Sequence, residues 1–532
     1  MTLFETVLSH ALLAIWLALP LSLLLLAGLA SWTRSDKRLT SAWNAAERLF
    51  IAGLPLSAVV GIYLMFAPQN LAVAGSSLGV YPSGLAVWMA LMVGFIAWVI
   101  LRYARDYLRA DPGFRTFLPW FLSTVASVLV LVLTDHLLVL AGAWIGVSLS
   151  LHQLLTLYPE RRQARLAAVQ KFIASRLGDL AIVSAVVLIW QHYGTFRIPE
   201  LYTLAAASPA QSETLTYASV LLAIAAALKC AQIPFHGWLI RVMEAPTPVS
   251  ALLHAGVINL GGFLWLRLFP VFDGFTAGHF LLLLVGGITA LVAVFTMMAQ
   301  TSVKHSLVWS TNAQMGFMLF EIGLGAYTLA FLHLLAHSLY KAHSFLAAGR
   351  TVKVSAVRFG GRVSKTSLTL ALLCAAIAGA LLWQFPGLVE NQPVLGALLV
   401  MAVAAAALGT PGVSPLQTKV LASGMALALV PIYAALHGLV GPALPESGAF
   451  ALPFNAAIAA WMIVALLGVW SLAVLLVPGA DWMARLHWPA SQGFYMDRPF
   501  ERFTRFWAQR WLAPTSSPTD HPIYRLSSGE HS

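Results

Sequence analysis

The chain has 532 residues, of which 59% are hydrophobic and only 10% are charged, and its mean hydropathy is +0.81. Soluble globular proteins carry roughly 25% charged residues. This composition therefore excludes a soluble globular protein, which could not bury so much apolar surface away from water. Many segments of about 20 residues have few or no charges, and this length crosses the hydrocarbon of a bilayer. We therefore predict an all-α polytopic membrane protein. The first hydrophobic segment lacks a basic n-region and is too long for a signal peptide, so we expect it to be retained.

About fifteen transmembrane helices are expected in chain order. They cover 10–32, 49–67, 81–101, 116–133, 136–157, 171–192, 216–239, 248–268, 279–299, 305–323, 328–349, 366–385, 394–410, 417–440 and 455–477. After them, FYMDRPFERFTRFWAQRWL (494–512) mixes aromatic residues and Arg at helical spacing, which predicts an amphipathic helix at the cytoplasmic interface. A disordered basic tail is the better interpretation of 513–532.

The net charge of +11 comes from Lys and Arg that cluster at alternate connections. The basic clusters lie at 34–48, 102–115, 161–165, 350–365 and 485–510, whereas 67–80, 134–136, 324–327, 385–394 and 441–454 have no Lys or Arg. This alternation follows the positive-inside rule and predicts an N-terminus outside and a C-terminus in the cytoplasm. It favours membrane lipid over nucleic acid as the partner of the basic residues.

Sequence motifs for cofactors are absent. Cys230 and Cys374 lie in separate apolar segments and form no CxxC pair, and an iron–sulfur cluster needs about four thiolates. The sequence contains no GxxxxGK[ST], no GxGxxG after a strand and no HExxH. We expect no metal site, no other cofactor and no enzymatic activity in this chain.

A lysine and a helix break coincide in LKCAQIPFHGW (228–238). A charge at membrane depth costs about 2.5–3.5 kcal/mol, which makes Lys229 a functional candidate. Pro234 removes a helix hydrogen bond, so we expect an interruption just after Lys229 that frees carbonyls to line a wet cavity. Pro246 and Pro248 predict a further break. A lysine that snorkels to an interface is the alternative.

Titratable side chains are densest in FLHLLAHSLYKAHSFLAAG (331–349). His333, His337 and Lys341 are spaced i, i+4, i+8 and share one helical stripe, which suits a proton relay. Zinc binding by the histidine pair is less favoured, because a lysine follows and no acid or thiol completes a site. His254, in APTPVSALLHAG, is assigned to the same pathway, with a structural hydrogen-bonding role as the alternative.

Three further charged residues are candidates. Lys304 begins VKHSLVWSTNAQMGF, whose polar residues indicate a hydrated face; a lysine that only sets the topology is an equal alternative. Arg176 and Asp179 in SRLGDL are i, i+3 and can pair locally. Lys229 is the alternative partner of Asp179.

These motifs, in this order and spacing, resemble the proton-conducting antiporter-like subunits of respiratory complex I and of the Mrp antiporters, over roughly residues 115–350. The resemblance implies two inverted five-helix repeats, each with a broken helix, joined by a polar axis at mid-membrane. We divide the chain accordingly into N-terminal helices (1–115), a first repeat (116–268), a degenerate second repeat (279–410), C-terminal helices (411–480) and a cytoplasmic amphipathic helix with its tail (481–532).

Two departures from the family pattern concern titrating groups. The family's fifth helix carries a glutamate after a tryptophan, but the matching stretch AWIGVS has Ile145 at that position. The family's second broken helix has a lysine or glutamate after a proline break. In AGALLWQFPGLVENQ (378–392) the break is assigned to Pro386, and only Glu390 follows. We therefore do not expect a complete complex I pumping channel.

With these departures, the chain resembles one branch of the family, the membrane subunit (DabB type) of bacterial DAB inorganic-carbon accumulation complexes. That resemblance implies a large cytoplasmic, carbonic-anhydrase-like partner (DabA type), which holds the zinc. It also implies a transporter subunit of the bacterial inner membrane, in which protons or sodium ions pass the candidate residues and drive CO2 hydration in the partner. Arg176 and Asp179 would tune Lys229. The alternatives are an antiporter-like subunit of complex I or of an Mrp exchanger, and a non-conducting membrane scaffold.

Overall fold

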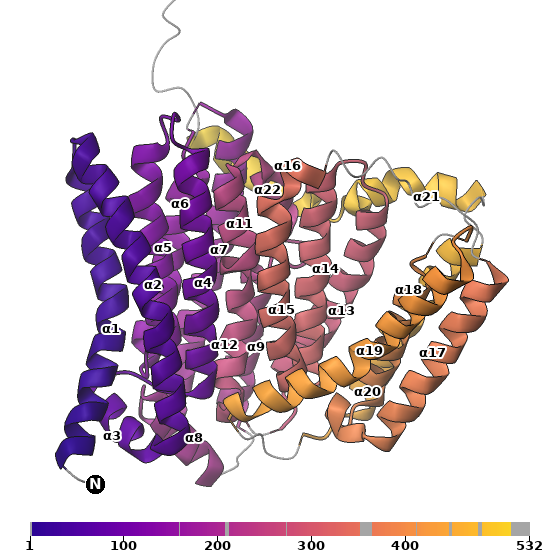
Figure 1. Cartoon of the computed structure of the whole chain (residues 1–532), viewed down its shortest axis with the longest axis horizontal. Helices are drawn as coiled ribbons and strands as arrows, with labels where there is room; N and C mark the ends of the chain where they lie inside the picture. Colours follow the sequence, from indigo (N-terminus) through magenta and orange to yellow (C-terminus); the bar gives the residue numbers. More distant parts are fainter. Residues whose placement is uncertain are drawn as a thin grey trace, which may run out of the picture.

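The computed structural model describes residues 3–158, 160–207, 212–272, 274–351, 364–410, 412–445, 450–476 and 481–511. Within these residues the regular structure is helical, apart from two isolated β-bridges. Figure 1 shows most helices side by side across the height of one bundle. The expected all-α membrane architecture is confirmed, and the expected tail at 513–532 lies outside the described residues.

The helices from Leu3 to Val271 form the side of the bundle that contains the N-terminus (Figure 1). Its helices are α1 (Leu3–Trp32), α2 (Asp36–Phe66), α3 (Pro68–Leu78), α4 (Gly84–Tyr107), α5 (Phe114–Leu133), α6 (Leu137–Leu155), α7 (Arg162–Tyr193), α8 (Ile198–Ala207), α9 (Glu213–Lys229), α10 (Gly237–Arg241), η1 (Val242–Glu244), α11 (Thr247–Ala255), η2 (Val257–Asn259), α12 (Leu260–Leu268) and η3 (Phe269–Val271).

The second part ends in a group of helices that leans away from the rest (Figure 1). It comprises α13 (Ala277–Met298), α14 (Val303–Gly323), α15 (Tyr327–Leu346), α16 (Ala348–Thr351), α17 (Lys365–Gln384), η4 (Pro386–Val389), α18 (Pro393–Leu408), α19 (Leu416–Val440), η5 (Gly441–Ala443), α20 (Phe454–Leu476), α21 (Asp481–Ser491), η6 (Gly493–Tyr495) and α22 (Arg498–Trp511). The helices α17, α18 and α19 share a small apolar core of their own, separate from that of the main bundle.

Each expected span coincides with a helical segment. Among the described residues, 11 segments are long and apolar enough to cross a membrane by length and composition. Four expected spans are not among these 11 segments. Two of them, α9 and α18, are short, with 17 and 16 residues, and the other two, α14 and α15, carry ionisable side chains. The total of fifteen therefore stays a prediction. In Figure 1 the N-terminus lies at the lower end of the bundle, near α3 and α8, and α22 lies at the upper end.

The helix that carries Lys229 ends at the expected place. The last residue of α9 is Lys229, irregular backbone follows, and Ala231 has a φ of 50°. Pro246 and Pro248 occupy the N-cap and the first turn of α11, so they begin a helix and do not interrupt one. A further interruption at η2, between α11 and α12, was not predicted.

Pro386 was assigned to a helix break, but it does not interrupt a helix. Pro386 begins the short turn η4, which connects α17 to α18. These two helices pack against each other as neighbours, so the proline lies between two spans. A proline is readily accommodated at a connection, because the preceding residue already leaves the helical conformation.

Candidate ion pathway

Lys229 lies in the interior of the bundle, where α6, α7 and α9 meet. Its Nζ is 4.2 Å from the ring centroid of Trp144 on α6, and Trp144 itself is buried. A desolvated ammonium over an indole face gains about 2 kcal/mol. This contact holds the lysine at the end of α9, one residue before the irregular segment, so the amine has a defined position beside a helix break.

Arg176 and Asp179 form the expected local ion pair on α7. Arg176 Nη2 lies 2.6 Å from Asp179 Oδ2. Asp179 also interacts electrostatically with Lys229. The carboxylate therefore stands between two cations, bound directly to the arginine and close enough to influence the lysine.

A second buried lysine, Lys171, shares this region and was not predicted. Its Nζ donates to Ser148 O at 2.5 Å and to Ser148 Oγ at 3.2 Å, and it is only 4% exposed. Lys171 and Lys229 both line a cavity of about 20 Å³, which has room for about one water molecule. Lys171 is the first residue of an expected span, where a lysine is easily interpreted as one that only sets the membrane topology.

His254 on α11 is fully buried and stacks on Phe345 of α15, with ring centroids 4.4 Å apart. Neither ring nitrogen has a hydrogen-bond partner among the described residues. Buried polar atoms in native proteins are usually satisfied by protein or by ordered water. The imidazole can accept at one nitrogen and donate from the other, and within the described part of the chain both nitrogens of His254 are free to do so. It interacts electrostatically with Lys341 and His337.

The stripe on α15 continues this polar line. His337 and Lys341 are buried, and the rings of His333 and His337 lie 6.3 Å apart. Lys341 Nζ donates to Leu307 O at 2.8 Å and also to Ser310 Oγ, both on α14. Eight residues of helix rise about 12 Å, so the stripe carries titratable groups along the bundle axis.

Glu321 is a functional candidate that the sequence reasoning missed. It lies near the end of α14, and each of its carboxylate oxygens is 3.0 Å from His333 Nδ1. A carboxylate within an apolar span is by default a functional candidate, because its charge is costly there. That rule alone would have identified it in MLFEIG.

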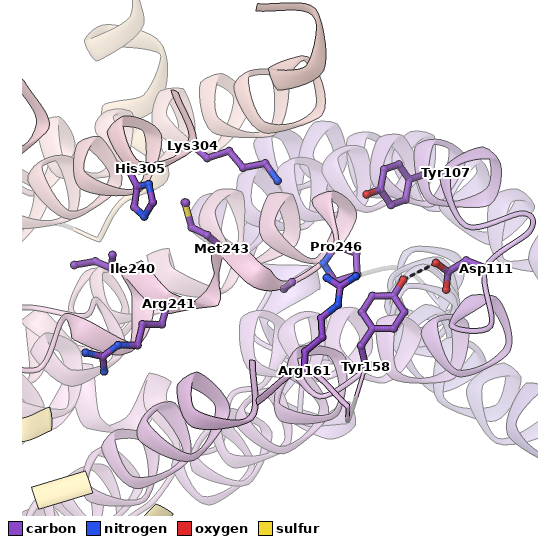
Figure 2. Close-up of a pocket in the computed structure, with 11 residues that line it drawn as sticks. Tyr107, Asp111, Tyr158, Arg161, Ile240, Arg241, Met243, Pro246, Lys304 and His305 are labelled. Carbon is purple, nitrogen blue, oxygen red and sulfur yellow. Dashed lines mark hydrogen bonds between the residues drawn. The ribbon is translucent and has the colours of Figure 1, made fainter. Parts of the chain in front are cut away.

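Lys304 does not join the buried line. It is exposed in the first turn of α14 and lines a cavity of about 620 Å³ with His305, Arg161 and Tyr158, as Figure 2 shows. Tyr158 donates to Asp111 Oδ2 at 2.7 Å, and burial together with this hydrogen bond raises the pKa of Tyr158. Lys304 therefore belongs to a wide, basic opening at the upper end, one helical turn from the carbonyl that holds Lys341.

Among the described residues, His, Cys, Asp and Glu do not form a group of three or more that could hold a metal ion. The histidines, carboxylates and lysines instead form a series that extends over α7, α9, α11, α14 and α15. Such a series suits transfer of a proton between neighbours, with water between those that do not touch.

Comparison with known protein families supports this interpretation. The family model described as "NADH:quinone oxidoreductase/Mrp antiporter, TM" matches residues 134–444, and that for the chain 5 N-terminus of complex I matches residues 72–118. The chain belongs to the NADH:quinone oxidoreductase/Mrp antiporter family. The family resemblance predicted from the motifs is thus confirmed, and the chain is a membrane ion-transport subunit by family.

Among curated relatives, the chain is 42% identical to the "Probable inorganic carbon transporter subunit DabB" of Hydrogenovibrio crunogenus over 64% of this chain and 66% of that protein. It is 35% identical to the "Probable inorganic carbon transporter subunit DabB2" of Halothiobacillus neapolitanus, over 86% of this chain and 87% of that protein. It is 34% identical to the NADH-quinone oxidoreductase subunit L of Pseudomonas aeruginosa, over 58% and 51%.

Solved structures share the fold. A chain in the Mrp complex from Dietzia sp. superposes with a TM-score of 0.59 and 24% identity, over 94% of this chain and 59% of that one. A chain of the archaeal membrane-bound sulfane sulfur reductase superposes with a TM-score of 0.56 and 16% identity, over 93% and 99%. At these identities the likeness establishes architecture alone.

Proposed function

We propose that this chain conducts a cation, with protons preferred and sodium as the alternative, and couples the gradient to uptake of inorganic carbon as CO2 or bicarbonate. The observation that carries the proposal is the line of buried titratable groups, because ionisable side chains within membrane spans are costly and typically mark ion pathways. The two relatives named as inorganic carbon transporter subunits supply the substrate class.

The residues act in sequence along the bundle. Lys229 and Lys171 line one small cavity, so the two amines meet at the end of α9. Asp179 interacts with Lys229 while it stays bound to Arg176. The switching step in our proposal is thus set by two lysines and one carboxylate, in a chain that has Ile145 where the family glutamate is expected.

The histidines link this cavity to α15. His254 takes a proton from water near the break and passes it toward His337 and Lys341. Lys341 then faces the first turns of α14, next to the basic cavity at the upper end. We place the cytoplasm on that side, in the inner membrane of a bacterium, with the N-terminus outside; the Lys and Arg alternation supports this orientation.

We propose a large cytoplasmic, zinc-binding, carbonic-anhydrase-like subunit (DabA type) as the partner at that end. It would hold the zinc and perform any CO2 hydration, while this chain supplies ion passage. The helix α22 lies at the upper end of the bundle (Figure 1), and the basic cavity lies at the first turn of α14; both offer surfaces to a soluble protein.

The experiment is purification in mild detergent with identification of the co-purified proteins, followed by cation flux in liposomes that contain the complex. We expect a zinc protein and gradient-driven flux that Lys341→Ala abolishes, while the exposed matched control Lys37→Ala leaves flux unchanged. Absence of flux in the intact complex would favour a membrane scaffold. Enzyme-like CO2 hydration by the chain alone would contradict the division of labour.

A subunit of complex I or of an Mrp-type exchanger is the second candidate. The 34% identity to the subunit L of Pseudomonas aeruginosa favours it, although that match spans only 51% of the relative. Co-purification of other complex I or Mrp subunits, in place of a zinc protein, would decide for this candidate.

A further inference from the structure

A second carboxylate–histidine pair lies outside the line of groups described above. Glu390 follows the turn η4, and its Oε1 is 3.6 Å from His437 Nε2 on α19. The same oxygen accepts a hydrogen bond from Leu329 N in the first turn of α15, at 3.0 Å. One carboxylate thus connects the α17–α18 turn to α19 and to the beginning of α15.

The backbone around Glu390 is unusual for this residue type. Glu390 has a φ of 51°, a left-handed conformation that costs a residue other than glycine about 1 kcal/mol. Tyr433, one turn before His437 on α19, donates to Leu388 O at 2.6 Å and holds the turn from the other side. The local structure therefore keeps a costly backbone conformation while it presents a carboxylate to α15.

The residue that donates to Glu390 lies one helical turn before His333. Leu329 and His333 are four residues apart on α15, which is about 6 Å along the axis and on one face. His333 contacts Glu321 at 3.0 Å, and Tyr433 interacts electrostatically with both Glu321 and Glu390. Two carboxylate–imidazole pairs thus follow each other at the lower end of α15, below His337 and Lys341.

Exposure falls steadily along this series. The side chains of Glu390 and His437 are 19% and 18% exposed, those of Glu321 and His333 are 11% and 13% exposed, and Lys341 is fully buried. The Nε2 atoms of His333 and His437 are buried without a hydrogen-bond partner among the described residues. Buried polar atoms are usually satisfied by protein or by ordered water, so a water at each of these atoms would supply the missing partner.

We propose that Glu390 and His437 form the access site through which protons enter the α15 route from the lower end of the bundle. The carboxylate takes a proton from water, the imidazole or a water carries it onward, and the Glu321–His333 pair delivers it to His337 and Lys341; no other bond changes. This inference rests on the proposed function. It assigns a role to the only carboxylate in the segment where the family's second lysine is missing.

The first test is proton flux by the intact complex in liposomes, with the variants Glu390→Gln and His437→Asn. A glutamine can still accept the hydrogen bond from Leu329 N, so the fold should be retained. We expect flux to fall on the order of tenfold or more, as for loss of a proton-transfer group. The matched control is Glu200→Gln, a surface carboxylate of α8 that is 53% exposed at the same end.

The second test is the side of access. A membrane-impermeant thiol reagent should label the His437→Cys variant in the intact complex when it is added on the N-terminal side only, with the labelling read as a mass shift. The wild type should stay unlabelled, since Cys230 and Cys374 are both buried. Labelling from the opposite side only, or no labelling at all, would overturn the inference.

Lys341→Ala separates this inference from the proposed function. If Lys341→Ala is inactive while Glu390→Gln and His437→Asn conduct like the wild type, the access site is wrong and the ion pathway stands. If Lys341→Ala and Lys229→Ala also conduct normally, the proposed function itself fails.

Discussion

The C-terminal helix α22 is tied to the segment that follows the break after Lys229. Arg241, the last residue of α10, lies 2.8 Å from Glu501 and 3.7 Å from Asp497, and it donates to Gln170 Oε1 at 2.6 Å. Gln170 in turn donates to Thr504 Oγ1 at 3.0 Å. We call this set of contacts the α22 clamp and predict that Arg241 is its main support.

The magnitude follows from these contacts. A hydrogen bond to a charged group contributes about 1.5–3 kcal/mol and a neutral one about 1 kcal/mol. Arg241 and Glu501 are 25% and 17% exposed, so solvent weakens their attraction only in part. Arg241→Met should therefore weaken the clamp by about 2–3 kcal/mol, which raises the detached fraction of α22 by about 30- to 160-fold at about 1.36 kcal/mol per decade.

Hydrogen exchange of the α22 amides in the intact complex measures this fraction. Arg241→Met should lose protection along 498–507, and Glu501→Gln should add little once Arg241 is replaced, because both remove one interaction. The matched control is Arg505→Met. Arg505 contacts Glu501 at 2.6 Å but is 62% exposed, and exposed i, i+4 pairs contribute only about 0.3–0.5 kcal/mol. Equal protection in the Arg241 and Arg505 variants would refute the reasoning.

Three further predictions concern the switch, the clamp and the topology. Lys229→Ala should abolish growth rescue at ambient CO2 in a host without carbonic anhydrase while the complex still assembles, and Asp179→Asn should weaken rescue less; normal rescue by Lys229→Ala would remove that lysine from the mechanism. Burial raises the pKa of Asp497 above its ordinary value of 3.8. Its contribution to the stability of the folded state is therefore full below pH 3.8 and is lost as the pH rises through the raised pKa. Asp497→Asn should remove this pH dependence from thermal unfolding curves. Reporter fusions after residue 365 should give a cytoplasmic signal, and a periplasmic signal would overturn the loop assignment.

The amphipathic helix near the C-terminus illustrates what one-dimensional patterns can predict. Aromatic residues and arginines at helical spacing predicted a helix at the bundle end, and α22 is there. They do not identify what each face of the helix contacts. Thr504 is fully buried and Glu501 faces Arg241, while Phe503 and Phe506 are exposed. Which face of a helix is covered depends on its neighbours, which the local pattern does not contain.

The amino-acid sequence by itself determined the membrane class, the positions of the expected spans, the family and the end of α9 at Lys229. These properties follow from hydropathy, proline chemistry and motif order within a few tens of residues. It also identified the stripe on α15, because spacing along one helix is a local property.

Only the tertiary structure decided which titratable groups face one another. Lys171 and Lys229 are 58 positions apart and line the same cavity. Glu390 contacts Leu329 on α15 and His437 on α19. Lys304 looked like a member of the pathway but lies at its upper opening. The physical reason is that a buried charge is tolerated only with partners or water close by, and helix packing brings those partners together from distant parts of the chain.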